Sequence, residues 1–125
     1  MSLSEYFEDV EGIGILATAD SEGNVDLAIY ARPHMVDDET LAFVMAQKTS
    51  YANVQSNPKA AYMFIEKTEG YKGKRIYLSK KAEETDPKKV ESLRRRKRYE
   101  SEDDSSTGSR AVYFAVDKVR PLVGG

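Results

Sequence analysis

The sequence contains no cysteine, no tryptophan and only one histidine among its 125 residues. Without cysteine, disulfide bonds and thiolate metal ligands are excluded, and a cytoplasmic location is the default expectation. A single histidine, His34, supplies too few ligands for a dedicated transition-metal site, so we expect no bound metal. A serine–histidine–aspartate triad would also depend on His34, and the stretch "RPHMV" around it provides no serine elbow.

Long apolar runs and an excess of charge of one sign are missing as well. No segment approaches the ~20 apolar residues of a membrane span, and the acidic start "MSLSEYFEDVEG" lacks the apolar region of a signal peptide. The 19 Lys and Arg nearly balance the 21 Asp and Glu, for a net charge of −2. The chain therefore has no overall field that attracts nucleic acid or a membrane surface. Its length predicts a single domain over residues 1–125.

Short apolar segments between turn-forming residues predict a mainly β protein. Pro33 cannot donate to a strand ladder, so it marks an edge, a bulge or the end of regular pairing. The segment "LAFVMA" is apolar on both faces, which indicates burial on both sides, as in a closed barrel or beneath a helix. The spacing favours an antiparallel β-barrel over parallel βαβ units. The six expected strands are 13–20, 25–36, 41–46, 60–67, 73–84 and 110–123.

Three helices are expected beside these strands. Apolar residues at helical spacing predict an amphipathic helix over 3–11, and a second, short helix follows the third strand. Asp86 and Pro87 provide a cap and a first turn for a third helix, which we expect over 87–100. The stretch 101–109 has no apolar residue, so we expect a mobile loop there.

The stretch "KTSYANVQSNP", residues 48–58, combines a cation and two hydroxyls at the start of the short helix. Thr49 and Ser50 are favourable N-cap residues, and Pro58 limits the helix to about two turns. The free N–H groups of a helix start attract anions, and with two hydroxyls and Lys48 they would suit a phosphate monoester. The alternative is that Thr49 only caps the helix and nothing binds. Local spacing leaves both interpretations open.

Residues 14–66 resemble the pyridoxamine 5′-phosphate oxidase-like FMN-binding split β-barrel family, in the form of its small FMN-binding proteins. The resemblance rests on "LATADSEGNV", a strand leading into "DDETLAF", the Lys-Thr-Ser cluster, an Asn, and "NP" before an apolar strand. It continues more weakly through "GYKGKRIYLSKKAEE" and "RAVYFAVDKVRPLVG". The resemblance implies a split barrel, a homodimer and an FMN in each of two clefts between the protomers. It also implies a flavin-dependent oxidoreductase or an electron carrier.

The resemblance assigns roles to individual residues. Lys48, Thr49 and Ser50 would hold the FMN phosphate, and Asn53 would brace the loop. No side chain matches a dedicated acid or base, so no catalytic residue is identified. The residues expected to line the isoalloxazine and ribityl chain are Ile29, Tyr30, Ala31 and Arg32, with Ala46 and Gln47 beneath the ribityl chain.

Arg32 has two interpretations. A guanidinium near the N1–C2=O edge would favour negative charge on the flavin ring, which is a usual way for a protein to tune its cofactor. Alternatively, Arg32 is a surface residue paired with one of the 21 acidic side chains.

The chain departs from the family in two ways. It ends in "VRPLVGG" and lacks the C-terminal arginine and histidine that grip pyridoxamine phosphate, so true pyridoxamine phosphate oxidase activity is disfavoured. Many members also carry more cations where this chain has "TSY". FMN would then bind weakly, or Lys72, Lys74 or Arg75 would lend charge across the dimer. Some relatives bind the deazaflavin F420 or haem instead. Haem is disfavoured because His34 is the only histidine available as an axial ligand.

The basic cluster "RRRKR", residues 94–98, supports a rival function as a small binding module for single-stranded nucleic acid or an acidic partner. The alternative is a solvated helix face, balanced by the acidic residues downstream. The near-neutral total charge favours the solvated face, so a nucleic-acid partner is disfavoured. A redox partner or a nicotinamide donor, and a dimer that has lost its cofactor, also remain as alternatives.

Overall fold

The computed structural model describes residues 2–93 and 108–124. In that part of the chain, seven strands form one antiparallel sheet in the order β2-β1-β5-β6-β7-β4-β3, accompanied by three helices. The strands are β1 (Gly12–Ala19), β2 (Val25–Ile29), β3 (His34–Asp37), β4 (Thr40–Met45), β5 (Lys59–Glu66), β6 (Gly73–Glu84) and β7 (Arg110–Pro121). The helices are α1 (Leu3–Asp9), α2 (Thr49–Ser56) and α3 (Pro87–Ser92). None of the helices in the described residues is long and apolar enough to cross a membrane.

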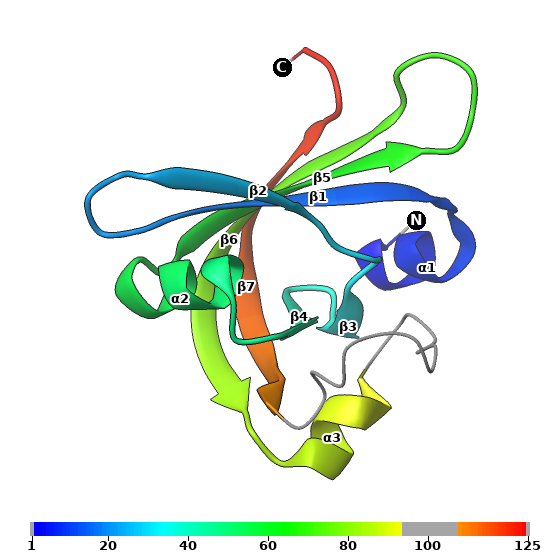
Figure 1. Ribbon diagram of the computed structural model, residues 1–125. Coiled ribbons are helices and arrows are strands. Elements are labelled where there is room, and N and C mark those ends of the chain that lie inside the picture. The colour runs from blue at the N-terminus through cyan, green and yellow to red at the C-terminus, as the bar shows by residue number, and fades with distance from the viewer. Residues whose placement is uncertain (1, 94–107, 125) are drawn as a thin grey trace, which may run out of the picture.

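The sheet is strongly bent, because its two longest strands carry irregularities that coil them. The ladder between β6 and β7 shifts register between Tyr77 and Leu78 and again between Lys80 and Ala82. Such bulges increase the local twist of a strand. Figure 1 shows β1, β2 and β5 crossing the upper part of the molecule and β3 and β4 below them, while β6 and β7 curve through both parts.

The expected second strand, 25–36, is in fact two strands, so the expectation of six strands was wrong. β2 ends at Ile29 and β3 begins at His34, and these consecutive strands lie at opposite edges of the sheet. Pro33 lies in the crossing between them, in agreement with its inability to donate to a ladder. Residues 30–32 belong to this crossing.

The helices agree with the sequence in place but not in extent. α1 ends at Asp9, before the expected 11, and begins with a capping box between Ser2 and Glu5. α3 begins at Pro87 with Asp86 as its cap, as expected. The rest of the expected helix 87–100, the basic cluster 94–98 and most of the loop 101–109 lie outside the described residues.

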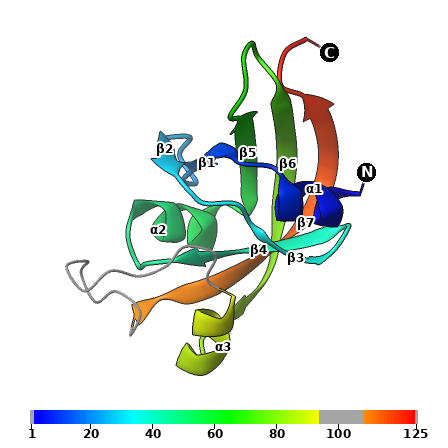
Figure 2. The ribbon, with the colours of Figure 1, turned by 90° about the vertical axis from the view of Figure 1, so that its right-hand side faces the viewer.

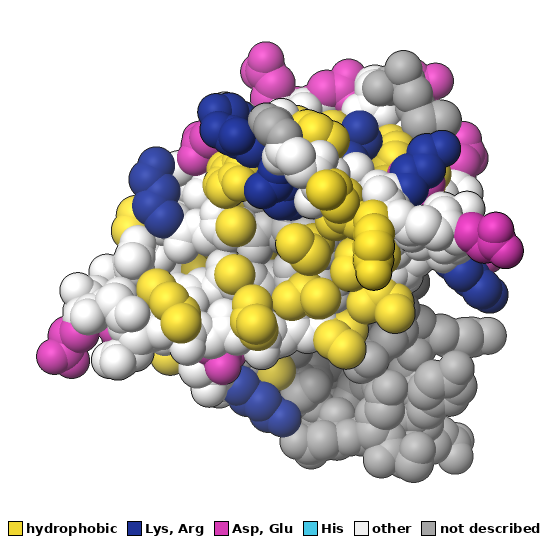
Figure 3. Space-filling view, turned by 90° about the horizontal axis from the view of Figure 1, so that it is seen from above, with side chains coloured by type: hydrophobic (Ala, Val, Ile, Leu, Met, Phe, Trp, Pro, Cys, Tyr) yellow, Lys and Arg dark blue, Asp and Glu magenta, His cyan; other side chains and the backbone are white. Residues whose placement is uncertain are grey.

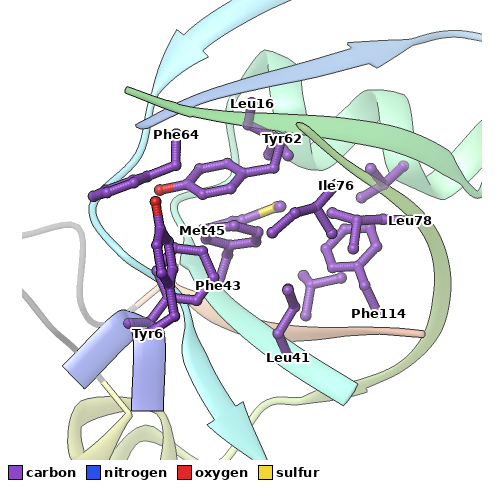
Figure 4. Packing of buried hydrophobic residues seen from close by; sticks show 13 residues of the cluster. Tyr6, Leu16, Leu41, Phe43, Met45, Tyr62, Phe64, Ile76, Leu78 and Phe114 are labelled. Atoms are coloured by element: carbon purple, nitrogen blue, oxygen red, sulfur yellow. The ribbon is translucent and has the colours of Figure 1, made fainter. Parts of the chain in front are cut away.

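The core fills the space that the bent sheet encloses. Phe7 of α1 is fully buried and makes an edge-on contact with Phe64, with the ring centroids 5.4 Å apart. β4 is buried at five of its six positions, as its two-sided apolar pattern predicted. Figure 4 shows the side chains of β1, β4, β5, β6 and β7 converging on one another. The labelled core residues are Tyr6, Leu16, Leu41, Phe43, Met45, Tyr62, Phe64, Ile76, Leu78 and Phe114.

The face of β2, β1 and β5 that points away from the core is apolar but exposed. On β2, Val25, Leu27 and Ile29 are 81%, 71% and 79% exposed. Ile29 lies opposite Ile15, which in turn lies opposite Met63, so these side chains share one side of the sheet. Figure 3 shows apolar side chains gathered on this side of the molecule. We call this surface, made of Ile13, Ile15, Val25, Leu27, Ile29 and Met63, the outer face.

Candidate functional site

A cavity of about 640 Å³ opens between β1, β2, β4 and the start of α2. Its volume is within the range of small-molecule sites, roughly 300 to 1,000 Å³. Figure 2 shows α2 between β2 and β4, at the point where the chain leaves β4. The crossing segment 30–32 forms part of the wall. Leu93, the C-cap of α3, and Ser109, which precedes β7, also contribute.

The cavity brings together eight of the ten residues that the sequence nominated. They come from two segments of the chain, 29–32 and 46–50. The eight are Ile29, Tyr30, Ala31, Arg32, Ala46, Lys48, Thr49 and Ser50.

Gln47 and Asn53 do not line the cavity. Gln47 donates from Nε2 to the carbonyl oxygen of Gly108 at 2.8 Å. Asn53 is buried and donates from Nδ2 to the hydroxyl of Thr18 at 3.0 Å, which ties α2 to β1. Both side chains therefore make contacts within the fold.

The start of α2 differs from the expectation by one or two residues. Lys48 is the N-cap, with φ −125° and ψ −157°, and no side chain in the described part of the chain caps the helix. Thr49 and Ser50 therefore lie inside the first turn, so their predicted capping role was wrong. Without a cap, the N–H groups of the first turn have no side-chain acceptor, which leaves the partial positive charge of the helix start uncompensated. Lys48 and Thr49 are exposed beside it.

Ser50 is only 6% exposed, and its side chain is a direct neighbour of the Tyr30 side chain. Burial raises the pKa of Tyr30, and its hydrogen bond with Ser50 offsets part of that effect. The ring of Tyr30 also makes an edge-on contact with Phe43, with centroids 5.5 Å apart. The phenol at this position therefore stays protonated at neutral pH and is held by two neighbours.

Tyr62, a core residue, holds the crossing segment 30–32 in place. The Tyr62 hydroxyl lies 3.0 Å from the carbonyl oxygen of Tyr30 and 3.2 Å from that of Ala31, and donates to them. Burial raises the pKa of this phenol well above its ordinary range. The approach requires Gly14, because a Cβ there would lie 1.8 Å from the Tyr62 hydroxyl oxygen.

Arg32 is held by main-chain oxygens at the end of α1. Its Nη1 donates to the carbonyls of Val10 at 3.1 Å and Glu8 at 3.3 Å. The carbonyl end of a helix carries partial negative charge, so this is a favourable place for a guanidinium. The expected alternative, pairing with an acidic side chain, is not what is observed, since these partners are carbonyls. The role of Arg32 beside a flavin stays a prediction.

Sequence reasoning missed several residues of the wall. Asp26 and Ala28 of β2 could have been found, because strand alternation places them on the face opposite to Leu27 and Ile29. His34 of β3 and Phe43 and Val44 of β4 carry no local signal of this kind. Their position depends on the crossing between β2 and β3.

The donor set determines what the cavity can hold. One end offers the uncapped start of α2 with Lys48 and Thr49, which suits an anion. The remainder combines apolar and aromatic residues with polar side chains, which are Asp26, Arg32, His34, Ser50 and Ser109. Among residues 2–93 and 108–124, no group of three or more His, Asp or Glu side chains forms a metal site. A flat aromatic molecule with a phosphate tail fits this set of residues.

Comparison with known families identifies this arrangement. The sequence model described as pyridoxamine 5′-phosphate oxidase matches residues 5–122, which is nearly the whole chain. The chain belongs to the pyridoxamine 5′-phosphate oxidase family. The resemblance drawn from the segment 14–66 is thereby confirmed. A search of curated proteins found no match.

Solved structures of low sequence identity share the fold. An FMN-binding protein from Syntrophomonas wolfei subsp. wolfei has a TM-score of 0.78 and 16% identity, covering 99% of this chain and 86% of its own. An F420 reductase has a TM-score of 0.70 and 18% identity, covering 93% and 94%. HutZ, a haem storage protein from Vibrio cholerae, has a TM-score of 0.63 and 13% identity, covering 97% and 95%. This fold is the split barrel expected from the sequence, with seven strands among the described residues in place of six.

Proposed function

We propose that this family member binds FMN in the cavity and acts as a flavin-dependent oxidoreductase or an electron carrier. The observation that carries the proposal is the cavity itself. It joins an uncapped helix start, flanked by Lys48 and Thr49, to a wall in which aromatic and apolar residues alternate with polar ones. Bound FMN would supply electron or hydride transfer, and the protein would supply binding, orientation and electrostatics.

The phosphate belongs at the start of α2. The first-turn N–H groups, the Lys48 ammonium and the Thr49 hydroxyl can all donate to a phosphate dianion. Ser50 contributes less than the sequence indicated, because it is buried and engaged with Tyr30. Lys74 and Arg75, expected to lend charge across a dimer, have partners within their own protomer. Lys74 lies 4.7 Å above the ring of Tyr6, and Arg75 donates to the carbonyls of Pro121 and Gly124.

The isoalloxazine belongs beside the crossing segment. Tyr30 and Ala31 are held there by Tyr62, so this wall is rigid before a ligand arrives. Arg32 adds a positive charge to the same wall. FMN is favoured over haem because an anion-binding helix start suits a phosphate. The histidine available for axial ligation, His34, already has an interaction within the protein.

The outer face supports a homodimer with the cavity at its interface. An exposed apolar patch of this kind marks an interaction surface. Ile13 and Ile29 belong both to the outer face and to the cavity wall. A second copy seated on the outer face would therefore cover the cavity mouth and exclude water from the flavin.

The first test is the visible absorption spectrum of the protein after FMN is added and the excess is removed. We expect a flavin spectrum that persists in the wild type and is lost in the double variant Lys48→Ala/Thr49→Ala. Lys67→Ala/Thr68→Ala, an exposed Lys-Thr pair outside the cavity wall, is the matched control and should retain FMN. A colourless protein would refute the proposal, and the same titration with F420 or haemin would then identify the alternative. Reduction by NAD(P)H would separate a reductase from a carrier.

A further inference from the structure

We propose that Glu83 of β6 is a positioning residue for the phosphate end of the site, acting by holding α2 in place. This inference rests on the proposed FMN function and assigns a role to a residue outside the cavity wall. Glu83 would not touch the ligand. Its effect would pass through the helix that carries Thr49 and the free N–H groups.

The Glu83 carboxylate binds two successive turns of α2. Oε1 accepts a hydrogen bond from the Tyr51 hydroxyl at 2.7 Å, and Oε2 accepts one from Nε2 of Gln55, also at 2.7 Å. Tyr51 and Gln55 are four residues apart, so they lie on one face of the helix. The Glu83 side chain therefore fixes both the position of α2 along its axis and its rotation about that axis.

The helix depends on such contacts because it has little stability of its own. It is eight residues long, and no side chain within residues 2–93 and 108–124 caps it. Isolated helices of this length are marginal in water, so tertiary contacts decide where the helix lies. On the other flank, Asn53 bonds to Thr18 of β1. The helix is thus held between β1 and β6, and Glu83 provides the hold on the β6 side.

The Lys80 ammonium neutralises the negative charge of Glu83, so that this charge does not repel an anion bound nearby. Nζ of Lys80 lies 2.6 Å from Oε2, and the two side chains are 18% and 19% exposed. Burial alone would raise the pKa of Glu83, but the hydrogen bonds from Lys80, Tyr51 and Gln55 outweigh burial and lower the pKa. The carboxylate is therefore ionised at neutral pH, and its bonds to the helix are of the stronger, charge-assisted kind.

The test compares the dissociation constants of FMN and of riboflavin, which lacks the phosphate, by flavin fluorescence. The variant is Glu83→Gln, which keeps the size of the side chain but has only one acceptor oxygen. We expect FMN affinity to fall about tenfold, the scale of a hydrogen bond to a charged group, while riboflavin affinity stays at the wild-type value. Glu84→Gln is the matched control. Glu84 lies next on β6 and contacts the main chain at Thr85 and Asp86 and the side chain of Lys89.

The ratio of FMN affinity to riboflavin affinity distinguishes a positioning role of Glu83 from a general effect on protein stability. A purely structural role would weaken both ligands equally or neither, and either result would overturn the proposal. If Glu83→Gln does not fold, Tyr51→Phe removes only one of the two bonds to the helix and should lower the ratio by a smaller factor. A wild type that binds FMN no better than riboflavin would refute the phosphate site itself. If the wild type binds FMN more tightly than riboflavin, and Glu83→Gln and Tyr51→Phe leave the ratio of the two affinities unchanged, only the role of Glu83 is refuted.

Discussion

The hydroxyl of Tyr62, a core residue of β5, donates a 3.0 Å hydrogen bond to the main-chain carbonyl of Tyr30 in the cavity wall. This contact joins the core directly to the candidate site. The N–H of Tyr30 still donates to the carbonyl of Gly14 in β1 at 3.0 Å, whereas its carbonyl accepts its hydrogen bond from a side chain.

Replacing Tyr62 by phenylalanine is therefore expected to destabilise the protein by about 1 to 3 kcal/mol, because two carbonyls lose their buried donor. The measurement is the free energy of unfolding from urea titration. Tyr71→Phe is the control, since Tyr71 is 86% exposed and should change stability little. Equal stability of Tyr62→Phe and the wild type would show that water replaces the lost donor.

Thr18→Val is expected to cost about 1 to 3 kcal/mol, because the change keeps the shape of the side chain but leaves the buried Asn53 amide without its acceptor. The hydrogen bond can be isolated by a double-mutant cycle with Asn53→Ala. We expect the double variant to lose less than the sum of the two single losses. Strict additivity would mean that the 3.0 Å contact contributes no coupling.

The sequence predicted the strands and helices of this protein better than the points at which they begin, end and connect. The apolar pattern of 41–46 predicted a strand buried on both faces, which β4 confirms, because that pattern reports burial directly. The split of 25–36 was missed because the two halves lie at opposite edges of the sheet, and separation in space leaves no local signal beyond Pro33. The start of α2 was displaced because hydroxyl residues are common at N-caps, and here the ordinary preference does not hold.

The candidate site could also be predicted only in part. The segments 29–32 and 46–50 came from a family resemblance, together with the chemistry of a helix start for 48–50. The fold places all of these residues except Gln47 on the cavity wall, and their role in binding stays a prediction. Gln47 was expected beneath a ligand, but its side chain bonds to Gly108, a residue distant in sequence. Nothing in the sequence indicated that Glu83 contacts α2. Its importance follows only from the packing of α2 against β6.

The outer face gives a prediction about assembly. Leu27→Glu places a charge on a side chain that is 71% exposed, so the fold of the protomer should tolerate it. Within an interface between two copies, the same charges would be buried without partners, so we expect the variant to be monomeric. The measurement is sedimentation velocity over a range of concentrations. Val36→Glu, on β3 at the other edge of the sheet, is the control and should stay dimeric. A monomeric wild type would refute the dimer.

Glu83 also predicts how stability depends on pH. Its pKa is lowered in the folded protein, so its contribution is present above the pKa of the unfolded chain and is lost as pH falls through the folded pKa. Glu83→Gln has no proton to gain at this position, so the acid decline of its unfolding free energy should be shallower than in the wild type. Urea titrations at a series of acidic pH values measure this slope. Glu84→Gln leaves the Glu83 network intact and should retain the wild-type contribution of Glu83.

Arg32→Ala is expected to make the reduction potential of bound FMN more negative, because electrons added to the ring lose a nearby positive charge. Arg32→Lys keeps the charge and should keep most of the potential. The potential is measured by equilibrium reduction against a reference dye, followed in the visible spectrum. Arg110→Ala is the matched control, since this arginine also donates to main-chain carbonyls, at Gly108 and Ser109, but does not line the cavity. If Arg32→Ala and Arg110→Ala shift the potential equally, the Arg32 charge does not act on the flavin, and its bonds to Glu8 and Val10 serve only to join the crossing segment to α1.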